Sequence, residues 1–399
     1  MYTPTIPAPI DDLWYGTSGP RDAQIVVVAE SWGTYEAQSK RPLVGPSGHE
    51  FDRMLHEAGF DRSQVFCTNC FAAQPPQNDV WRFFHTKQSG MPKWKGLQPT
   101  EWAKSELDRL HRQIAAIGPK VVIACGNYAL WALTEEGLVS FGSESTGDGA
   151  TVLAPTGIMS WRGSMLLSPD GTKLLPIIHP AAILRAWYQR AVTVHDLSNR
   201  LPSGLAGDWR PANPPTIISK PDFDRAHSVL SNWLLRCTSG DLLPLSHDIE
   251  TSRGIITCMA FADGPYDGGA TALVLPLVRP SYGRTFESYW TPQEELSLVQ
   301  ISRELLLRAR IIGQNYNYDT QWIERDWGIR PNLDFDTMLA HHLLWPGTPK
   351  GLDYLASLYN KYYWYWKDDN KEWEVKADGW EAHLRYNAED ALRTFECAT

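Results

Sequence analysis

The sequence lacks long apolar runs, a leader-like N-terminus and a high cysteine content. Its longest apolar runs, such as residues 25–29 and 121–125, are far shorter than the roughly 20 residues that a membrane-spanning helix requires. The N-terminal residues contain no basic region followed by an apolar stretch, so no secretory signal is expected. Six cysteines in 399 residues are too few for a disulfide framework. These absences predict a cytoplasmic protein without a membrane partner.

The sequence also lacks the excess of basic residues that is typical of nucleic-acid-binding proteins, since its net charge is −9. This acidity is concentrated in one half of the chain. Residues 1–210 contain 19 Lys and Arg against 20 Asp and Glu, whereas residues 211–399 contain 18 against 26. The second half therefore either stays away from phosphate groups or has carboxylates that bound metal ions neutralise.

The length and composition predict a globular protein of two domains. Hydrophobic residues make up 43% of the chain and charged residues 21%, which excludes a disordered or fibrous protein. Residues 205–221 are rich in proline and glycine and have no sustained periodicity, which is typical of a linker. We therefore expect a first domain at residues 1–205, a linker at 206–235 and a second domain at 236–399.

The first domain alternates β-branched runs with amphipathic stretches, for example IVVVAE, HEFDRMLHEAGF and VFCTNCFA. This alternation predicts an α/β fold in which helices cover a parallel sheet, a three-layer α/β/α arrangement. Functional side chains of such sheets lie at the carboxyl ends of the strands. Glu30, Asn69 and His179 each close a predicted strand and are therefore candidate site residues.

The second domain begins with three predicted strands and is mostly helical afterwards, and it contains three pairs of polar residues at regular spacing. Residues two apart on a strand, or four apart on a helix, point to the same side. The pairs are Asp248 with Glu250 on a predicted strand, Asn315 with Asp319 on a predicted helix, and Tyr386 with Asp390 on another. Hard divalent cations such as Mg²⁺ take oxygen ligands, and two of them together can clamp a phosphodiester.

In order, the segments DIET, NYNYD, DFDTM and YNAED resemble the motifs of the 3′-to-5′ proofreading exonuclease domain of family A DNA polymerases, in the branch with tyrosine in its third motif. The resemblance covers residues 240–396 and implies an RNase H-like domain with a mixed sheet. It implies two Mg²⁺ or Mn²⁺ ions, and their ligands would be Asp248, which bridges both ions, Glu250, Asp319 and Asp390. It also implies that Tyr386 orients the attacking water, as general base or by position, and that Asn315 contacts the substrate.

Three further features of the second domain need an interpretation. Asp336 matches a family position that buttresses the site, although a helix N-cap explains it equally well. His341 and His342 are adjacent on a predicted helix and point in different directions, so we expect no zinc site there. The tryptophan- and tyrosine-rich residues 360–373 are expected to form an aromatic surface insertion or a partner face.

A second series of motifs lies in the first domain: AESWG, RPLVGPSGHEFDRML, VFCTNCFAAQPP, PKVVIACGNYAL and HPAAILR. The series resembles the uracil-DNA glycosylase superfamily, especially family 4 and its phage-encoded relatives, over residues 20–200. It implies that Glu30 polarises the water and stabilises the cationic sugar, and that His179 donates toward the base O2 anion. Asn69 would read the edge of a flipped pyrimidine. Amides around Gly45 and Gly48 would grip flanking phosphates.

The first domain departs from that family at several positions. Leu43 stands where an aromatic residue usually stacks on the flipped base, and the nearby Trp32 replaces a proline. The family's iron–sulfur cluster needs four cysteines, but here Cys67 and Cys70 lie in an apolar strand without a second pair. We therefore predict no iron–sulfur cluster.

Together these features predict a metal-dependent 3′-to-5′ DNA exonuclease of proofreading type, fused to a glycosylase-like domain as in some phage polymerases. Its partners would be DNA, as a single-stranded 3′ end or a primer-template, and a DNA polymerase, either as a separate subunit or as a C-terminal domain of one chain. The setting would be the host cytoplasm if the protein is phage-encoded. Two alternatives remain open: a repair enzyme that also excises uracil, and a first domain that only binds DNA or docks a polymerase.

Overall fold

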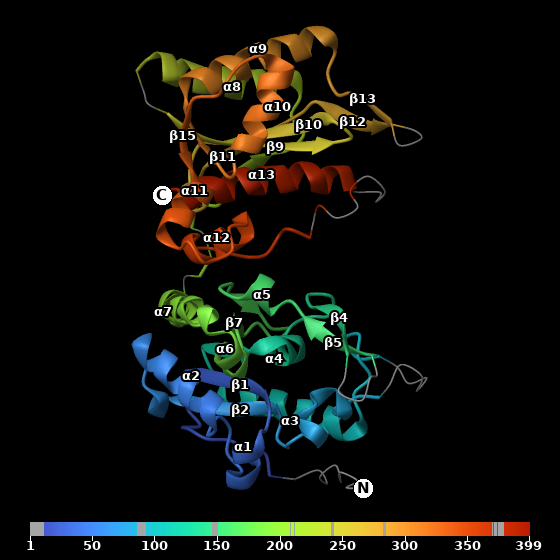
Figure 1. Ribbon diagram of the computed structural model, residues 1–399, viewed down its shortest axis with the longest axis vertical. Coiled ribbons are helices and arrows are strands. Elements are labelled where there is room, and N and C mark those ends of the chain that lie inside the picture. Colours follow the sequence, from blue (N-terminus) through green and yellow to red (C-terminus); the bar gives the residue numbers. More distant parts are fainter. Residues whose placement is uncertain are drawn as a thin grey trace. The chain divides into compact units, whose positions relative to one another are not determined.

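The computed structural model divides into two compact units, Met1–Trp209 and Arg210–Thr399 (Figure 1). It describes residues 12–85, 93–145, 151–207, 209–210, 212–240, 243–281, 285–368, 370, 373 and 379–399. Within these residues, no helix is both long and apolar enough to cross a membrane. The division between the units falls inside the predicted linker.

The first unit alternates strands with helices along the chain. Its elements, with η marking a 3-10 helix, are β1 (Ile25–Ser31), α1 (Thr34–Ser39), α2 (Pro46–Glu57), η1 (Arg62–Gln64), β2 (Val65–Phe71), η2 (Pro76–Asn78), η3 (Val80–Phe83), α3 (Glu101–Ile117), β3 (Val121–Cys125), α4 (Gly126–Leu133), β4 (Ser140–Ser145), β5 (Thr151–Thr156), α5 (Ile158–Trp161), β6 (Leu166–Leu167), β7 (Lys173–Ile177), α6 (Pro180–Arg185), η4 (Trp187–Gln189) and α7 (Arg190–Ala206).

The main sheet of this unit has the order β2-β1-β3-β7-β6. The strands β2, β1, β3 and β7 run parallel, and β6 pairs antiparallel with β7. Val122 and Ala124 of β3 pack in one core with α3 and α4. The neighbouring Val121 faces α7, where a Cβ added to Gly204 would lie 2.8 Å from its methyl group. Because successive side chains of a strand face opposite sides, helices cover both faces of the sheet, which confirms the predicted α/β fold.

The second unit is built from a mixed sheet and longer helices. Its elements are β8 (Thr216–Ile218), α8 (Phe223–Thr238), β9 (Pro244–Ser252), β10 (Ile255–Ala262), β11 (Thr271–Pro276), β12 (Val278–Ser281), β13 (Thr285–Ser288), α9 (Pro292–Arg308), β14 (Arg310–Gly313), α10 (Asn317–Trp327), β15 (Leu333–Asp336), α11 (Thr337–Leu344), α12 (Leu352–Tyr359) and α13 (Gly379–Cys397).

The sheet of the second unit has the order β15-β14-β9-β10-β11-β8. Strands β9, β10 and β11 form an antiparallel meander, while β14, β15 and β8 join by parallel pairing. Helices α8 and α9 pack on one face of the sheet, and α13 covers the other (Figure 1). The face under α13 is made of small and branched residues such as Ala260 and Val274, so the helix lies close to the strands.

The prediction that residues 206–235 form a linker is wrong for most of that range. Strand β8 pairs with β11, and helix α8 contributes Ala226, Leu230 and Trp233 to the core of the second unit. These apolar residues recur every three or four positions, which is a helical pattern. The side chain of Asp222 caps the helix by accepting a hydrogen bond from the Arg225 amide. The proline-rich residues before them obscured this signal.

The prediction that residues 360–373 form a surface insertion is also wrong for the residues that the structure describes. Tyr362, Tyr363, Trp366 and Trp373 are each less than 10% exposed. They pack against α12 and α13 or their neighbours rather than facing solvent. The aromatic content of this segment therefore belongs to the core beside α13, and residues 369, 371 and 372 lie outside the described part.

Candidate active sites of the two units

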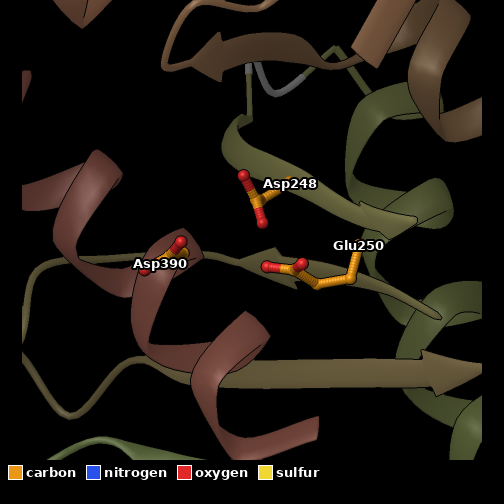
Figure 2. A group of neighbouring side chains, drawn as sticks. All are labelled: Asp248, Glu250 and Asp390. Atoms are coloured by element: carbon orange, nitrogen blue, oxygen red, sulfur yellow. The ribbon is translucent and has the colours of Figure 1, made fainter. Parts of the chain in front are cut away.

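The first candidate site is a cluster of carboxylates in the second unit. Strand β9 carries Asp248 and Glu250 on one face, because they are two residues apart. Helix α13 presents Asp390 toward both of them (Figure 2). Carboxylate oxygens of the three residues lie within 4.8 Å of one another. The fold thus brings Asp390 next to side chains that lie 140 and 142 positions before it in the chain.

Asp319 lies beside this group of three on helix α10 and is 4% exposed. Its Oδ1 atom accepts a hydrogen bond of 3.0 Å from the backbone amide of Ile249, between the two acidic residues of β9. This contact fixes the start of α10 against the strand. The fourth predicted carboxylate is therefore oriented by the same strand that carries the first two.

The structure corrects the prediction that Asn315 and Asp319 share a helix face. Helix α10 begins only at Asn317, and Asn315 precedes it as an exposed residue with a φ of +52°. The carboxylate of Asp336 holds this turn by accepting hydrogen bonds from the amides of Asn315 and Tyr316. Asp336 also caps α11, so both interpretations of this residue describe real contacts. Asparagine tolerates a left-handed conformation better than most residues, which permits the turn.

The carboxylates of this site are buried close together, and burial and their mutual repulsion outweigh the positive charge of the nearby Lys367. Burial, with the negative charges of Asp390 and Asp319, raises the pKa of Asp248 well above its ordinary range. Burial and Asp390 raise the pKa of Glu250 to about 8, and burial raises that of Asp319 to about 7. Such an all-oxygen set of crowded carboxylates suits hard divalent cations such as Mg²⁺ or Mn²⁺. The residues present therefore fit the metal ions that the sequence predicted.

Three residues of this site were missed at the level of sequence. The buried Asn387 donates a hydrogen bond of 2.7 Å from Nδ2 to Oδ2 of Asp248. Trp366 donates from Nε1 to Oδ1 of Asp390 at 2.5 Å, and Lys367 donates from Nζ to both oxygens of Asp390. Asn387 stands inside the YNAED segment and could have been recognised there. No spacing or motif marked the other two residues.

Tyr386 lies one turn before Asp390 on α13, and its hydroxyl accepts a hydrogen bond of 2.8 Å from Lys367 Nζ. Burial and the nearby charges of Asp390 and Glu250 raise the pKa of Tyr386 above its usual range. The phenol therefore stays protonated at neutral pH. A protonated phenol can donate a hydrogen bond.

His341 and His342 do not form a pair of ligands. The ring nitrogens of the buried His341 are hydrogen-bonded to the hydroxyls of Tyr359, at 2.7 Å, and Thr348, at 2.8 Å. His342 is exposed. Both nitrogens of His341 thus serve to connect α11 with its surroundings.

The second candidate site is a pocket of about 510 Å³ in the first unit, at the carboxyl ends of β1, β2 and β7. Glu30, Asn69 and His179 all line it, as the sequence predicted for strand ends of a parallel sheet. Leu43 also lines the pocket and has a φ of +52°. Trp32, which is 2% exposed, forms part of the same wall.

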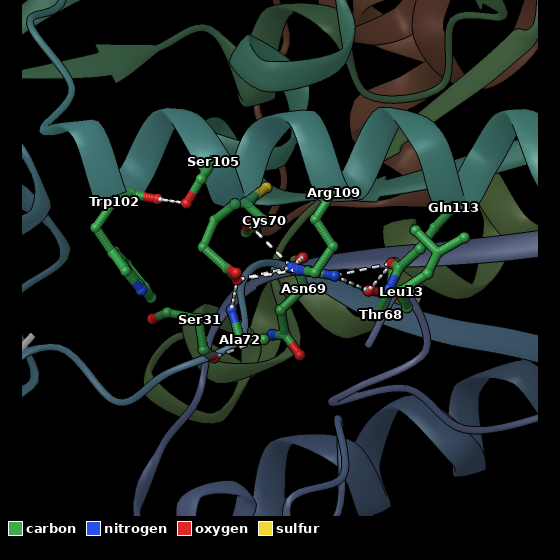
Figure 3. Close-up of polar contacts among 11 residues, drawn as sticks. Leu13, Ser31, Thr68, Asn69, Cys70, Ala72, Trp102, Ser105, Arg109 and Gln113 are labelled. Carbon is green, nitrogen blue, oxygen red and sulfur yellow. Dashed lines mark hydrogen bonds and ion pairs between the residues drawn. The ribbon is translucent and has the colours of Figure 1, made fainter. Parts of the chain in front are cut away.

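Asn69 is held by a buried polar network beneath the pocket (Figure 3). Its Nδ2 atom donates to the carbonyl of Ser31 at 3.1 Å, and its own carbonyl accepts from Arg109 at 3.0 Å. Arg109 is in turn fixed by Glu106 and Gln113 on α3. The side-chain oxygen of Asn69 is buried and has no hydrogen-bond partner among the described residues. A buried amide oxygen without a partner is suited to accept a hydrogen bond from a ligand.

His179 has a defined tautomer, because its Nδ1 atom accepts a hydrogen bond of 3.1 Å from the amide of Ala181. The ring proton is therefore assigned to Nε2. Burial, together with the positive charge of Arg185, lowers the pKa of His179 to about 4. At neutral pH the pocket thus contains a neutral imidazole with one N–H donor.

The prediction for Gly45 is wrong in one respect, since its amide already has a partner. The amides of Val44 and Gly45 donate to Oε1 of Glu36, at 3.1 and 2.8 Å, and Glu36 is 7% exposed. A carboxylate of the chain thus lies where the phosphate was expected. Gly48 serves close packing, because an added Cβ would lie 2.0 Å from the carbonyl oxygen of Leu43. Neither glycine lines the pocket.

Cys67 and Cys70 lie on β2 and are both fully buried free thiols. Residues three apart on a strand face opposite sides of the sheet, so the two sulfur atoms do not converge. Burial raises the pKa of Cys67 to about 12, which disfavours the thiolate that a metal cluster needs.

Two family models match this chain in the order of its units. The uracil DNA glycosylase superfamily matches residues 16–198, and a family of 3′-5′ exonucleases matches residues 246–399. The pocket lies inside the first match and the carboxylate cluster inside the second.

Two relatives of the first unit are type-4 uracil-DNA glycosylases. The protein of Thermotoga maritima is 27% identical over 168 residues, which cover 42% of this chain and 69% of that protein. The protein of Archaeoglobus fulgidus is 32% identical over 111 residues, or 28% of this chain and 47% of that protein. The chain therefore carries a domain of the uracil DNA glycosylase superfamily followed by a 3′-5′ exonuclease domain.

Proposed function

We propose that the second unit is a divalent-metal-dependent 3′-to-5′ DNA exonuclease of proofreading type. The observation that carries this proposal is the convergence of Asp248, Glu250 and Asp390, whose oxygens lie within 4.8 Å of one another. Asp319 adds a fourth carboxylate, fixed to the same strand. When bound, Mg²⁺ or Mn²⁺ ions supply electrostatic stabilisation of the attacking and leaving oxygens of a phosphodiester.

The residues of the chain have separate tasks in this proposal. The four carboxylates hold the ions, and Asn387 keeps the carboxylate of Asp248 in one orientation. The protonated hydroxyl of Tyr386 orients the attacking water as a hydrogen-bond donor. Asn315 is exposed on the turn before α10 and contacts the substrate strand.

A labelled oligonucleotide tests the proposal. We expect a single-stranded DNA to shorten from its 3′ end with Mn²⁺ or Mg²⁺ and to stay intact with EDTA. Asp319→Asn should lower the rate by about two orders of magnitude or more, because a metal ligand is weakened. Asp326→Asn on the same helix is the matched control, since Asp326 pairs with Arg325 at the surface. Digestion that survives EDTA, or that is equal in both variants, would contradict the proposal.

Uracil excision by the first unit is the second candidate function. It is favoured by the unpartnered oxygen of Asn69, which suits the N3–H of a flipped uracil, and by the Nε2–H donor of His179, which suits the developing O2 anion. Both groups line the same pocket as Glu30. The family model of the uracil DNA glycosylase superfamily matches this unit.

A uracil-release assay separates this candidate from a first unit that only binds DNA or docks a polymerase. An active pocket should release uracil from single-stranded DNA, and Glu30→Gln should stop the release. Glu101→Gln, an exposed change at the start of α3, should leave it unchanged. DNA binding without any release would favour the binding module. Leu43 cannot stack on a flipped base as an aromatic residue would, so binding of the flipped base should be weaker by roughly 1 to 3 kcal/mol.

A proofreading exonuclease acts beside a DNA polymerase. We therefore include in the proposal a polymerase partner or polymerase domain, a primer-template as the DNA substrate, and the cytoplasm as the location. A primer with a mismatched 3′ end should be shortened faster than a matched one, because its end is more often single-stranded. Equal rates on both primers would argue against proofreading and for general trimming of 3′ ends.

A further inference from the structure

A lysine from the aromatic segment reaches the carboxylates of the exonuclease site. Lys367 follows Trp366, and its side chain is 24% exposed. Its ammonium lies 2.7 Å from Oδ2 and 3.0 Å from Oδ1 of Asp390, and 2.8 Å from the hydroxyl of Tyr386. An ammonium has three protons, so these contacts use its whole donor capacity.

The position of Lys367 is fixed by the chain on which it lies. Residues 361–366 are held to helix α13 by Arg393, which is fully buried. The Arg393 guanidinium stacks 3.8 Å from the ring centroid of Trp364 and donates to the carbonyl of Tyr362 at 2.7 Å. Glu396, also on α13, accepts from the Lys361 amide at 2.9 Å.

Helix α13 thus carries both the partners of Lys367 and the anchors of its segment. Asp390 and Tyr386 lie on the same helix as Arg393 and Glu396. The ammonium, the carboxylate and the phenol therefore form one hydrogen-bonded group. The position of Lys367 beside Asp390 therefore depends on the buried Arg393, which holds the segment that carries the lysine.

The contacts leave Asp390 with limited capacity for further ligands. Its Oδ1 atom accepts from both Trp366 and Lys367, whereas Oδ2 accepts from Lys367 alone. A carboxylate oxygen can accept two hydrogen bonds. Oδ1 therefore has both of its acceptor positions occupied, whereas Oδ2 has one left for a metal ion. A positive charge at this distance also repels a divalent cation that uses the same carboxylate.

We propose that Lys367 is a positioning residue of the exonuclease site: its ammonium fixes the Tyr386 hydroxyl and shares Asp390 with the divalent ions, and so sets how tightly the site binds them. Because Lys367 donates to the phenol oxygen, the single hydroxyl proton of Tyr386 points away from the ammonium. The cost of this arrangement is weaker metal binding, and its benefit is a fixed water-orienting group. The inference rests on the exonuclease function proposed above.

The test measures metal binding separately from catalysis. Mn²⁺ binding to the full chain is measured by isothermal titration calorimetry, and DNA degradation by steady-state kinetics with saturating Mn²⁺. Lys367→Met removes the charge at similar length. It should bind Mn²⁺ about tenfold more tightly, because one repulsive charge is lost. Its kcat should fall by about tenfold or more while KM for DNA stays within about threefold, because Tyr386 loses its partner.

Two variants complete the test. Lys367→Arg keeps the positive charge and should keep a Mn²⁺ affinity within about threefold of the wild type. Lys361→Met changes a lysine of the same segment that lies 3.4 Å from Asp267 at the surface, and it should change neither quantity. If Lys367→Met does not fold, Lys367→Gln replaces it with the same expectation.

The outcomes separate the two proposals. A wild-type chain that binds no Mn²⁺ and degrades no DNA overturns the exonuclease function itself. A wild-type chain that does both, with a Lys367→Met variant whose Mn²⁺ affinity is unchanged or weaker, overturns only the role of Lys367. Tighter Mn²⁺ binding with a lower kcat supports it.

Discussion

At the scale of single residues, Asn387 is the clearest case of a side chain that acts through a neighbour. It is fully buried, and its amide donates to Oδ2 of Asp248 at 2.7 Å. Asn387→Leu keeps the size but removes the donor, so Asp248 is free to turn. We expect the exonuclease rate to fall about 10- to 100-fold, as for other groups that orient metal ligands. A single-turnover assay with saturating Mn²⁺ measures this.

The exposed Asn317 at the start of α10 provides a control for that experiment. Asn317→Leu makes the same chemical change outside the carboxylate cluster and should leave the rate within about twofold, since exposed substitutions rarely propagate. Equal rates for Asn387→Leu and the wild type would show that the strand alone orients Asp248.

His179 predicts a pH dependence of stability in the first unit. Its pKa in the folded chain is about 4, below the ordinary value of 6.5, so the folded state binds fewer protons than the unfolded state between these values. The contribution of the neutral His179 to the free energy of unfolding is complete above pH 6.5, and it is lost as the pH falls toward 4. Between pH 7 and 4.5 the wild type should lose about 2 to 3 kcal/mol more than His179→Gln. Urea unfolding of both proteins at each pH measures the difference, and parallel curves would contradict it.

The sequence predicts correctly that residues at a regular spacing on one strand, such as Asp248 and Glu250, lie together. Asp248 and Glu250 lie together because a strand has a period of two. Lys367 has no such signal, since its place is determined by the stacking of Arg393 on Trp364, far along the chain. Contacts of this kind depend on tertiary packing, so they cannot be predicted from the spacing of residues within one segment.

At the scale of elements, the aromatic segment and α13 form one structural unit that depends on Arg393. Its guanidinium lies between aromatic rings, 4.4 Å from that of Tyr266 and 3.8 Å from that of Trp364. Arg393→Lys keeps the charge but loses the planar group that stacks on these rings and donates to the carbonyl of Tyr362. We expect a loss of about 2 to 4 kcal/mol of unfolding free energy, because buried groups lose their partners.

Urea unfolding measures this loss, and limited proteolysis near residues 361–368 shows whether the segment detaches. Arg308→Lys is the matched control, because Arg308 pairs with Glu304 on the exposed side of α9. The control should change stability by less than about 0.5 kcal/mol. If both variants unfold alike, the aromatic segment is held by its other contacts.

The elements also show where sequence patterns mislead. Residues 206–235 look like a linker because prolines and glycines dominate their first part, yet α8 begins at Phe223 with a full apolar face. Residues 362–366 look exposed because charged residues flank them, yet Tyr362, Tyr363 and Trp366 are buried, and the last two pack against α12. In both segments the average composition points to an exposed or irregular structure, whereas the spacing or the contacts of individual residues determine the structure that forms.

At the scale of the whole molecule, the hydrophobic cores found among the described residues lie within one unit or the other. The acidic balance of residues 211–399 belongs to the unit with the carboxylate cluster. The pKa values of Asp248, Glu250 and Asp319 are all raised, so ionising these carboxylates without bound metal destabilises the folded unit. Metal ions should therefore affect the stability of this unit and not that of the other.

The pH dependence of this effect has a definite sign. The pKa of Glu250 is about 8 in the folded chain against an ordinary 4.5, so its contribution to stability is complete below pH 4.5 and is lost as the pH rises through 8. Asp319, with a pKa of about 7, acts in the same direction. Without metal, the second unit should melt at a lower temperature at pH 8 than at pH 6. Mn²⁺ binds the ionised carboxylates, so its stabilising effect should be larger at pH 8.

Differential scanning calorimetry with EDTA or Mn²⁺ at both pH values tests this expectation. At one fixed Mn²⁺ concentration, a hundredfold above the Kd at pH 8, Mn²⁺ adds about 2.7 kcal/mol at pH 8 and less at pH 6, where its Kd is higher. For a unit of this size that raises Tm by about 5 to 10 °C. Only the transition of the second unit should move, and Asp390→Asn should reduce the shift. A uniform shift of both transitions, or an equal shift at pH 6 and pH 8, would mean that Mn²⁺ acts somewhere other than the carboxylate cluster.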